Sequence, residues 1–384
     1  MRLAERAHTL PPSGIRKFFE LTEARDDVIS LGVGEPDFSA PWAARTAAID
    51  SLERGRTSYT ANRGIAALRE RIAAHHERYG QRYDPETEVV VTTGASEAVD
   101  LAFRALVDPG DVVAVHEPTY ISYRPGIELA GGKPLAVPTR AADDFRLTRE
   151  RLEAAGADAA DLLVLCYPNN PTGAIMDEGT LAEVAAFCRE HDLRVVADEI
   201  YAALTYGGEH ASIATQPGMR ERSVVINGFS KAYAMTGLRL GYALGPADAI
   251  DGMNRIHQYT MLSAPTTAQH AAMAALDRCD EEVREMVDEY NRRRRLVVSR
   301  FNGMGLDTFE PKGAFYAFPD CGGDDDRFAE ELLESTGVAV VPGSVFGSGG
   351  EGHLRVSYAT SMRELKEATD RMAAFVEEAW EPDR

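Results

Sequence analysis

Cysteine, lysine and long apolar runs are all scarce in this chain of 384 residues. No apolar run reaches the length of about 18 residues that a membrane-spanning helix needs. The first residues, Met1–Arg6, lack an apolar signal core, so a cytoplasmic location is expected. The cysteines form neither a CxxC pair nor a zinc spacing, so we expect reduced, structural thiols and no metal site. They are Cys166, Cys188, Cys279 and Cys321.

Basic residues are outnumbered by acidic ones, 41 to 61, which gives a formal net charge of −20. A nucleic-acid-binding protein needs a basic surface, so this balance argues against that class. The densest acidic run, Asp324–Asp326, is interpreted as a solvated loop. Abundant acid with few lysines suggests a host with a salty cytoplasm, where salt would screen the self-repulsion of the surface.

Short, almost wholly apolar runs alternate with alanine-rich helical stretches through the first two thirds of the chain. The helical pattern is clearest at 95–107 and 180–191. Apolar strands separated by helices predict an α/β fold, with a mainly parallel sheet covered by helices on both faces. The strand-like runs are 88–93, 111–115, 161–166, 193–198 and 223–227.

The last third of the chain has a different pattern. Residues 264–300 read as long helices that end in four consecutive arginines, 292–295. This run either binds an anionic partner or, as we favour, lies on a solvated helix face that pairs with the acids at 281–289. Short strands at 314–318 and 353–357 and a helix at 362–378 predict a smaller α+β domain. We expect an N-terminal segment, 1–42, packing with the small domain, a large domain, 43–275, and the small domain, 276–384.

One of only five lysines, Lys231, lies in a loop of small and apolar residues, where a solvated charge is not expected. Its amine can form a Schiff base with an aldehyde cofactor. The neighbouring Ser230 and, eight residues later, Arg239 supply a hydroxyl and a guanidinium suited to a phosphate. The loop therefore predicts a site for a phosphorylated aldehyde.

Two further segments lie where parallel sheets bind ligands. Thr93–Ala98 joins a strand to a helix, where free N–H groups favour a phosphate, although tight packing alone explains its small residues equally well. Asp198 ends an apolar strand and would point into the crevice at the sheet edge. It would equally serve as an ordinary helix N-cap.

Two more motifs have both a plain and a chemical interpretation. The turn formers of Pro168–Gly173 mark a surface turn, or they aim Asn170 at a bound ring oxygen through a cis Asn170–Pro171 bond. Arg355 lies mid-strand among apolar neighbours. It is either a surface salt-bridge partner or a bidentate clamp for a carboxylate.

Taken together and in order, these motifs resemble the class I/II pyridoxal-phosphate aminotransferases of fold type I, across essentially the whole chain. The subgroup they resemble most contains aspartate and aromatic aminotransferases. The matching segments are Gly34–Phe38, Tyr59–Thr60, Gly94–Ser96, Pro118–Tyr120, Asn169–Gly173, Ala197–Tyr201, Ser230–Lys231, Gly237–Gly241, Lys312–Tyr316 and Arg355–Ala359.

The resemblance implies pyridoxal 5'-phosphate as cofactor and a homodimer as the active unit. Lys231 would carry the Schiff base and shuttle the proton, and Asp198 would pair with the pyridine nitrogen. Substrate would contact Gly34, Tyr120, Asn170 and Arg355, with Ile15 as an apolar wall. The remaining implied cofactor contacts are Ala95, Ser96, Ser230 and Arg239 at the phosphate, Tyr59 from the partner subunit, Tyr120 on the ring face, and Asn170 and Tyr201 at the ring oxygen.

The implied activity is ping-pong transfer of an amino group between an L-amino acid, aspartate or aromatic, and a 2-oxo acid such as 2-oxoglutarate. Some aspartate-preferring relatives carry a lysine where this chain has Ser96, which favours aromatic or broad substrate use. Arg16 is the remaining candidate for reading an acidic side chain. The alternatives are a β-lyase or another fold type I enzyme with the same cofactor, a DNA-binding regulator, and an inactive homologue.

Overall fold

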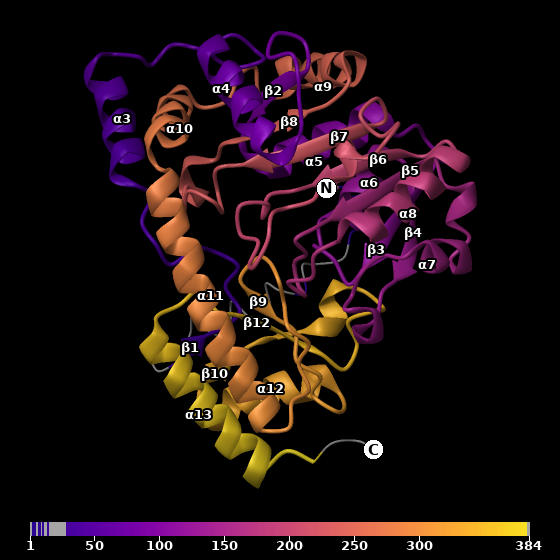
Figure 1. Ribbon diagram of the computed structural model, residues 1–384, viewed down its shortest axis with the longest axis vertical. Helices are drawn as coiled ribbons and strands as arrows, with labels where there is room; N and C mark the ends of the chain where they lie inside the picture. Colours follow the sequence, from indigo (N-terminus) through magenta and orange to yellow (C-terminus); the bar gives the residue numbers. More distant parts are fainter. Residues whose placement is uncertain (1, 5–6, 9, 11–13, 15–27, 382–384) are drawn as a thin grey trace.

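The computed structural model describes residues 2–4, 7–8, 10, 14 and 28–381. Its upper part in Figure 1 is built on a seven-stranded sheet with the order β2-β8-β7-β6-β5-β3-β4. The strands are β2 (Val89–Thr92), β3 (Val112–Glu117), β4 (Lys133–Pro138), β5 (Leu162–Cys166), β6 (Arg194–Asp198), β7 (Ser223–Gly228) and β8 (Gly241–Leu244).

The sheet is mainly parallel, as the apolar runs predict, and only β8 runs against its two neighbours. The sequence pattern missed β4 and β8. The β4 strand lies at the edge and contains Lys133, Pro134 and Pro138, so it lacks an apolar pattern. The β8 strand begins at Gly241, where a Cβ would lie 2.3 Å from the backbone nitrogen of Ala95. That glycine lets the strand lie directly against the turn between β2 and the next helix.

Helices cover both faces of this sheet, which confirms the predicted α/β class. One face packs on α5, α6 and α9, and the other packs on α3, α4, α7, α8 and α10. Side chains alternate between the two cores along each strand; in β5, for example, Leu163 and Leu165 belong to one core and Leu162 and Val164 to the other. The helices are α3 (Trp42–Glu53), α4 (Ala66–His76), α5 (Gly94–Leu106), α6 (Tyr123–Ala130), α7 (Arg149–Ala154), α8 (Glu178–Glu190), α9 (Ala247–Thr260) and α10 (Thr266–Arg278).

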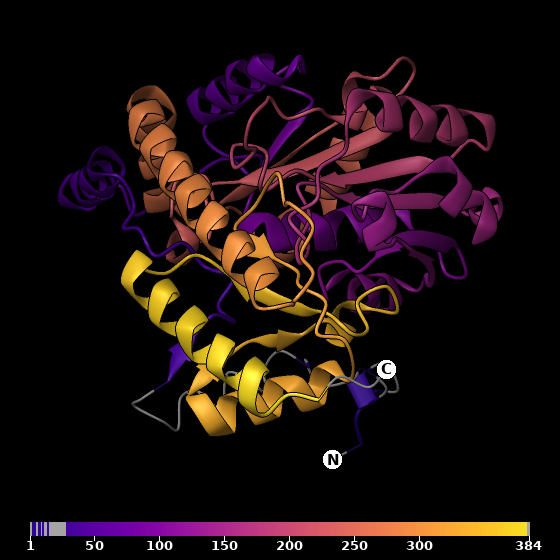
Figure 2. The ribbon, with the colours of Figure 1, turned by 60° about the horizontal axis from the view of Figure 1, so that its bottom comes forward.

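The long helix α11 (Asp280–Gly303) leads from the large sheet to a smaller lobe, seen in orange and yellow in Figure 1. Figure 2 shows α13 in front of this lobe, with α11 extending behind it. A three-stranded antiparallel sheet, β11-β12-β9, forms the lobe's wall toward the large sheet. The elements are β9 (Tyr316–Ala317), α12 (Asp325–Thr336), β10 (Val338–Ala339), β11 (Val341–Pro342), β12 (Leu354–Ser357) and α13 (Met362–Glu378).

The N-terminal strand β1 (Ile29–Ser30) pairs in parallel with β10, far away in sequence. The chain then returns toward the large sheet and enters α3, so residues 32–38 pass between the two lobes. The predicted domain boundaries at 42 and 275 remain a prediction. Across the described residues, no helix combines the length and apolarity needed to cross a membrane.

Two expectations about charged runs need correction. Arg292 and Arg293 pair with Glu289, as predicted, but Arg293 and Arg294 are buried rather than on a solvated face. Their burial follows from stacking on tyrosine rings and further ion pairs within the chain. The acidic run at 324–326 is no free loop either, because Asp324 caps α12 and Asp325 is buried as an acceptor for Ser344. All four cysteines are buried, and none forms a disulfide.

Candidate active site

A cavity of about 530 Å³ opens at the carboxyl ends of the parallel strands, between the sheet and the smaller lobe. It brings together residues from nine of the ten matching segments, which are spread from position 34 to position 355 along the chain. The predicted site residues that line it are Gly34, Ala95, Ser96, Tyr120, Asn170, Asp198, Tyr201, Ser230, Lys231, Arg239 and Arg355. Tyr59 is not among the lining residues and is 80% exposed. Ile15 lies outside the described residues.

Lys231 follows β7 and reaches across the cavity. Its Nζ donates a hydrogen bond to the carbonyl oxygen of Gly34 over 2.5 Å. The amine also lies 5.8 Å and 5.7 Å from the ring centres of Tyr201 and Phe315. The lysine is thus held by one carbonyl and two aromatic rings, and no carboxylate within the described chain forms an ion pair with it.

The environment makes this amine a weaker base than an ordinary lysine. Burial lowers the pKa of Lys231 to about 8, and the cations Arg355 and Arg239 act in the same direction. Glu35 and Asp198 oppose the shift. A pKa of about 8 leaves far more free amine at neutral pH than an ordinary lysine has, and a nucleophile or a general base requires the free amine.

Asp198 ends β6 and lies on the cavity floor. Its Oδ2 accepts a hydrogen bond of 2.7 Å from the hydroxyl of Tyr123, and its Oδ1 accepts one of 3.1 Å from the backbone of Ile200. Burial raises the pKa of Asp198 to about 6, with Glu199 adding to the effect and the two hydrogen bonds opposing it. Residues 200–203 form a turn and not a helix, so the interpretation of Asp198 as a helix N-cap is wrong, and its carboxylate lines the cavity. Sequence reasoning missed Tyr123, although it lies three residues beyond the predicted Tyr120.

Arg355, in the middle of β12, is a buried cation, and among the described side chains no acid pairs with it. Its two terminal nitrogens donate to Asn170 Oδ1 over 3.1 Å and to the carbonyl oxygen of Gly32 over 2.6 Å. Its Nε is buried without any partner. The interpretation as a surface salt-bridge residue is therefore wrong, because a buried, unpaired guanidinium calls for an anion.

Asn170 follows β5 in a tight turn, and the Asn170–Pro171 bond is cis, as predicted. Because Asn170 Oδ1 faces Arg355, its Nδ2 is left as a donor on the cavity side. On the same wall the hydroxyls of Tyr201 and Tyr316 are 2.9 Å apart. Tyr316 lies in one of the matching segments but was not predicted as a site residue. It brings the smaller lobe into contact with the cavity.

The opposite end of the cavity is shaped for an anion. The first turn of α5 has no side-chain cap, so the N–H groups near Ala95 and Ser96 lack side-chain acceptors. Gly94 has a φ of 79°, and a Cβ there would lie 2.7 Å from a guanidinium nitrogen of Arg239. Ser230 adds a hydroxyl to the lining. A phosphate at this end, an amine in the middle and a carboxylate on the floor fit a phosphorylated pyridine aldehyde.

Comparison with known proteins agrees with this geometry. The family model described as aminotransferase class I and II matches residues 26–372. The chain belongs to this family. Enzymes of the family use pyridoxal phosphate, and the reaction of this aminotransferase is a transamination between amino acids and 2-oxo acids.

Its relatives cover almost the whole aminotransferase chain. YugH of Bacillus subtilis, named as an aminotransferase without a stated substrate, is 50% identical over 97% of this chain and 98% of its own. An aspartate aminotransferase of Pyrococcus abyssi is 42% identical over 98% and 99%. The crystal structure of an aromatic aminotransferase from Pyrococcus horikoshii superimposes with a TM-score of 0.89, at 43% identity, over 95% and 99% of the two chains.

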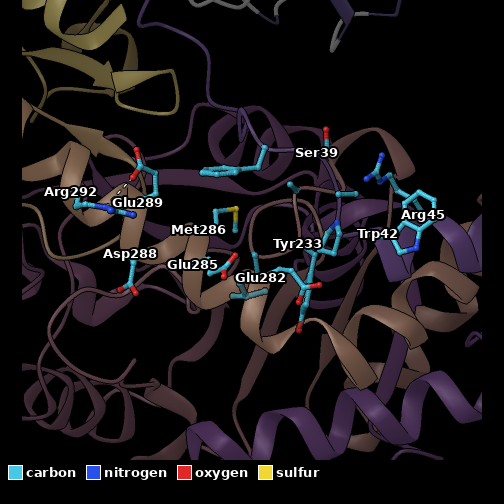
Figure 3. A pocket seen from close by; sticks show the side chains of 16 residues that line it. Ser39, Trp42, Arg45, Tyr233, Glu282, Glu285, Met286, Asp288, Glu289 and Arg292 are labelled. Carbon is cyan, nitrogen blue, oxygen red and sulfur yellow. Dashed lines mark ion pairs between the residues drawn. The ribbon is translucent and has the colours of Figure 1, made fainter. Parts of the chain in front are cut away.

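A second cavity of about 640 Å³ lies behind the lysine loop of the aminotransferase (Figure 3). It is lined by the start of α3, by Ala232–Ala234 and by α11, whose carboxylates dominate the view. Of these, Glu289 already pairs with Arg292. Among its described lining residues, the cavity contains neither the lysine amine nor a buried polar atom without a partner.

Proposed function

We propose that this aminotransferase moves the amino group of an aromatic or acidic L-amino acid to a 2-oxo acid such as 2-oxoglutarate in a ping-pong reaction. The observation that carries the proposal is that Arg355, a buried guanidinium with an unpartnered Nε, faces the same cavity as Lys231. A guanidinium binds a carboxylate through two parallel hydrogen bonds. The α-carboxylate common to every amino acid and 2-oxo acid would satisfy it.

Each end of the cofactor has residues suited to hold it. Ala95 and Ser96 through their N–H groups, with Ser230 and Arg239, would bind the phosphate. Lys231 would bind the aldehyde carbon covalently. Asn170 Nδ2 and the Tyr201 hydroxyl would donate to the ring oxygen, while Tyr120 would stack on the ring face and contact the substrate. When bound, pyridoxal phosphate supplies an electron sink for the electrons left by the departing Cα proton.

The protein's own groups handle the proton. Asp198 would hold a proton on the ring nitrogen, because a carboxylate next to that nitrogen favours its protonated form. Lys231, with a pKa lowered to about 8 by burial, would take the proton from Cα of the substrate and deliver it to the former aldehyde carbon of the cofactor. Gly34 and Arg355 would orient the substrate so that Cα faces the amine.

The side-chain preference follows from what the cavity lacks. Lys231, Arg239 and Arg355 are the cations that line its described part, and each already has a role. None is left there to read a second carboxylate, which favours an aromatic substrate over strict aspartate use. Arg16, the remaining candidate, lies outside the described residues, as does Ile15, the proposed apolar wall.

The active unit we propose is a homodimer in which Tyr59 reaches the phosphate of the partner subunit. Tyr59 belongs to an exposed apolar surface that also includes Tyr259, 88% exposed, and Met261. The two segments are tied together, because Asn62 donates to the carbonyl oxygen of Leu262 over 2.6 Å. Exposed large apolar side chains gathered in this way are typical of a protein interface.

We also propose a cytoplasmic enzyme, and the net charge of −20 leads us to propose a salt-accumulating host. Like charges on the surface repel one another, and the repulsion falls as salt screens it. Activity and thermal stability should therefore rise with salt concentration. Full activity and stability in a low-salt buffer would contradict this proposal.

The function is tested by half-reactions. The purified protein, loaded with pyridoxal phosphate in high salt, is mixed with single amino acids while the absorption band of the lysine-bound cofactor is followed. Tyrosine or phenylalanine should bleach the band, and 2-oxoglutarate should restore it. Bleaching by aspartate alone would contradict the aromatic preference, and pyruvate and ammonia released from cysteine conjugates without an acceptor would indicate a β-lyase.

The role of Lys231 has its own control. Lys231→Ala should remove both the absorption band and turnover, whereas Lys366→Ala, on the exposed face of α13, should change neither. Turnover by Lys231→Ala at the wild-type rate would refute the assignment.

A further inference from the structure

One carboxylate in the cavity has no place in the chemistry described so far. Glu35 and Asp198 are the acidic residues that line its described part, and only Asp198 has a proposed role. The Oε1 atom of Glu35 accepts a hydrogen bond from the hydroxyl of Thr236. Thr236 belongs to the same loop as Lys231, five residues further on. Glu35 therefore contacts the loop that carries the reactive amine.

The residue before Glu35 contacts the same loop at a second point. The carbonyl oxygen of Gly34 accepts the hydrogen bond from Lys231. A side chain would not fit at position 34 without displacing Tyr316, because a Cβ there would lie 2.6 Å from the Tyr316 hydroxyl. Gly34 and Glu35, two consecutive residues between the lobes, thus accept hydrogen bonds from the lysine loop, one from Lys231 and one from Thr236.

We propose that Glu35 is a positioning residue, which is anchored by Thr236, keeps the Gly34 carbonyl on Lys231, and favours the proton on the lysine nitrogen. The proposal rests on the proposed role of Lys231 in transamination. The lysine nitrogen must hold the proton between its removal from Cα and its delivery to the cofactor carbon. A nearby negative charge stabilises the protonated amine during this interval.

The charges around the lysine support this assignment. Four charged side chains act on Lys231: Arg355 from β12, Arg239 from its own loop, Asp198 from β6, and Glu35 from the segment between the lobes. The two arginines lower the pKa of the lysine and the two acids raise it, with Glu35 the strongest of the four. Burial leaves that pKa at about 8, so loss of Glu35 would lower it further.

The test is a pH titration of the loaded enzyme, followed by the absorption band of the lysine-bound cofactor rather than by turnover. Glu35→Gln should move the midpoint down by about half a pH unit, because Glu35 is exposed and solvent screens part of its charge. Thr236→Val, which keeps the charge and removes its anchor, should move the midpoint in the same direction by less. If Glu35→Gln does not fold, the shift in Thr236→Val decides the question.

Asp37→Asn is the matched control. It removes one negative charge from the same segment, but Asp37 pairs with Arg293 on α11 and not with the lysine loop. Its midpoint should equal that of the wild type. Equal midpoints in Glu35→Gln and the wild type, or equal shifts in Glu35→Gln and Asp37→Asn, would overturn the proposal.

A second readout separates this proposal from the proposed function. The chain has five lysines, so isotope-labelled lysine in the cofactor-free full-length chain gives few NMR signals, and Lys231→Ala assigns the one of interest. Glu35→Gln should lower the titration midpoint of that signal as well. If Lys231→Ala still binds the cofactor and turns over, the proposed function fails. If only the Glu35→Gln shift is missing, the positioning role fails and the function stands.

Discussion

The hydroxyl of Tyr123 donates a 2.7 Å hydrogen bond to the carboxylate of Asp198, and both residues are buried. Tyr123 begins α6 and Asp198 ends β6, so the bond joins a helix on one face of the sheet to the edge where the cavity opens. It occupies one of the two carboxylate oxygens. It also offsets part of the rise that burial imposes on the pKa of Asp198.

Tyr123→Phe should shift the pH dependence of the enzyme. The hydrogen bond lowers the pKa of Asp198, so its loss should move that pKa above about 6 and carry the acid limb of the kcat/KM profile to higher pH. The matched control is Tyr120→Phe, which removes a tyrosine hydroxyl from the same cavity without touching Asp198. Identical profiles for Tyr123→Phe and the wild type would show that the hydrogen bond does not tune the carboxylate.

Arg355→Lys should weaken binding of every substrate to a similar extent. A lysine supplies a point charge without the paired donors of a guanidinium, so KM should rise by about two orders of magnitude for donors and acceptors alike. Steady-state kinetics with tyrosine, aspartate and 2-oxoglutarate test this. Arg294→Lys, at a buried arginine outside the cavity, is the control. A change confined to one substrate would mean that Arg355 reads a side chain instead.

Hybrid dimers test the proposed role of Tyr59. Tyr59→Ala and Lys231→Ala should each lose most activity, but a hybrid of the two has one site in which both residues are wild type. Co-expression with two different affinity tags isolates the hybrid, which should be far more active than either parent. A hybrid no more active than its parents would show that Tyr59 does not serve the partner's site.

Much of the candidate active site could be predicted from the sequence, because the carboxyl ends of parallel strands lie at the same edge of a sheet. Residues at or just after the ends of the apolar strands therefore lie close together. Asp198 ends an apolar strand, and Asn170 and Lys231 lie in the loops that follow two others, so their meeting in one cavity follows from the topology. The cis bond at Asn170 was likewise suggested by a local motif.

The residues that sequence reasoning missed depend on contacts between distant segments. Tyr316 reaches Tyr201 only because the smaller lobe packs against the sheet, and Glu35 meets Thr236 only because β1 pairs with β10. The burial of Arg293 also arises from a contact distant in sequence, with Asp37. No periodicity within a short window carries such information, since each contact is set by tertiary packing.

The last prediction concerns stability in acid. His116 is fully buried in β3, its Nε2 accepts the backbone N–H of Cys166 over 3.1 Å, and its Nδ1 has no partner. Burial lowers the pKa of His116 from 6.5 to about 3, so in the folded protein the ring stays neutral where the unfolded chain takes up a proton. Its contribution to stability is therefore complete above pH 6.5 and is lost as the pH falls from 6.5 toward 3.

Within that window His116 should reduce the free energy of unfolding by about 1.4 kcal/mol per pH unit. Urea unfolding of the wild type and of His116→Gln at a series of pH values measures this slope. Glutamine keeps an acceptor for the N–H of Cys166 but does not titrate, so the variant should lose stability less steeply between pH 6.5 and 4 than the wild type, whatever its stability at pH 7. His191→Gln, at the half-buried residue that caps the C-terminus of α8, is the control and should keep the wild-type slope. Parallel slopes in His116→Gln and the wild type would mean that the buried ring accepts its proton without cost.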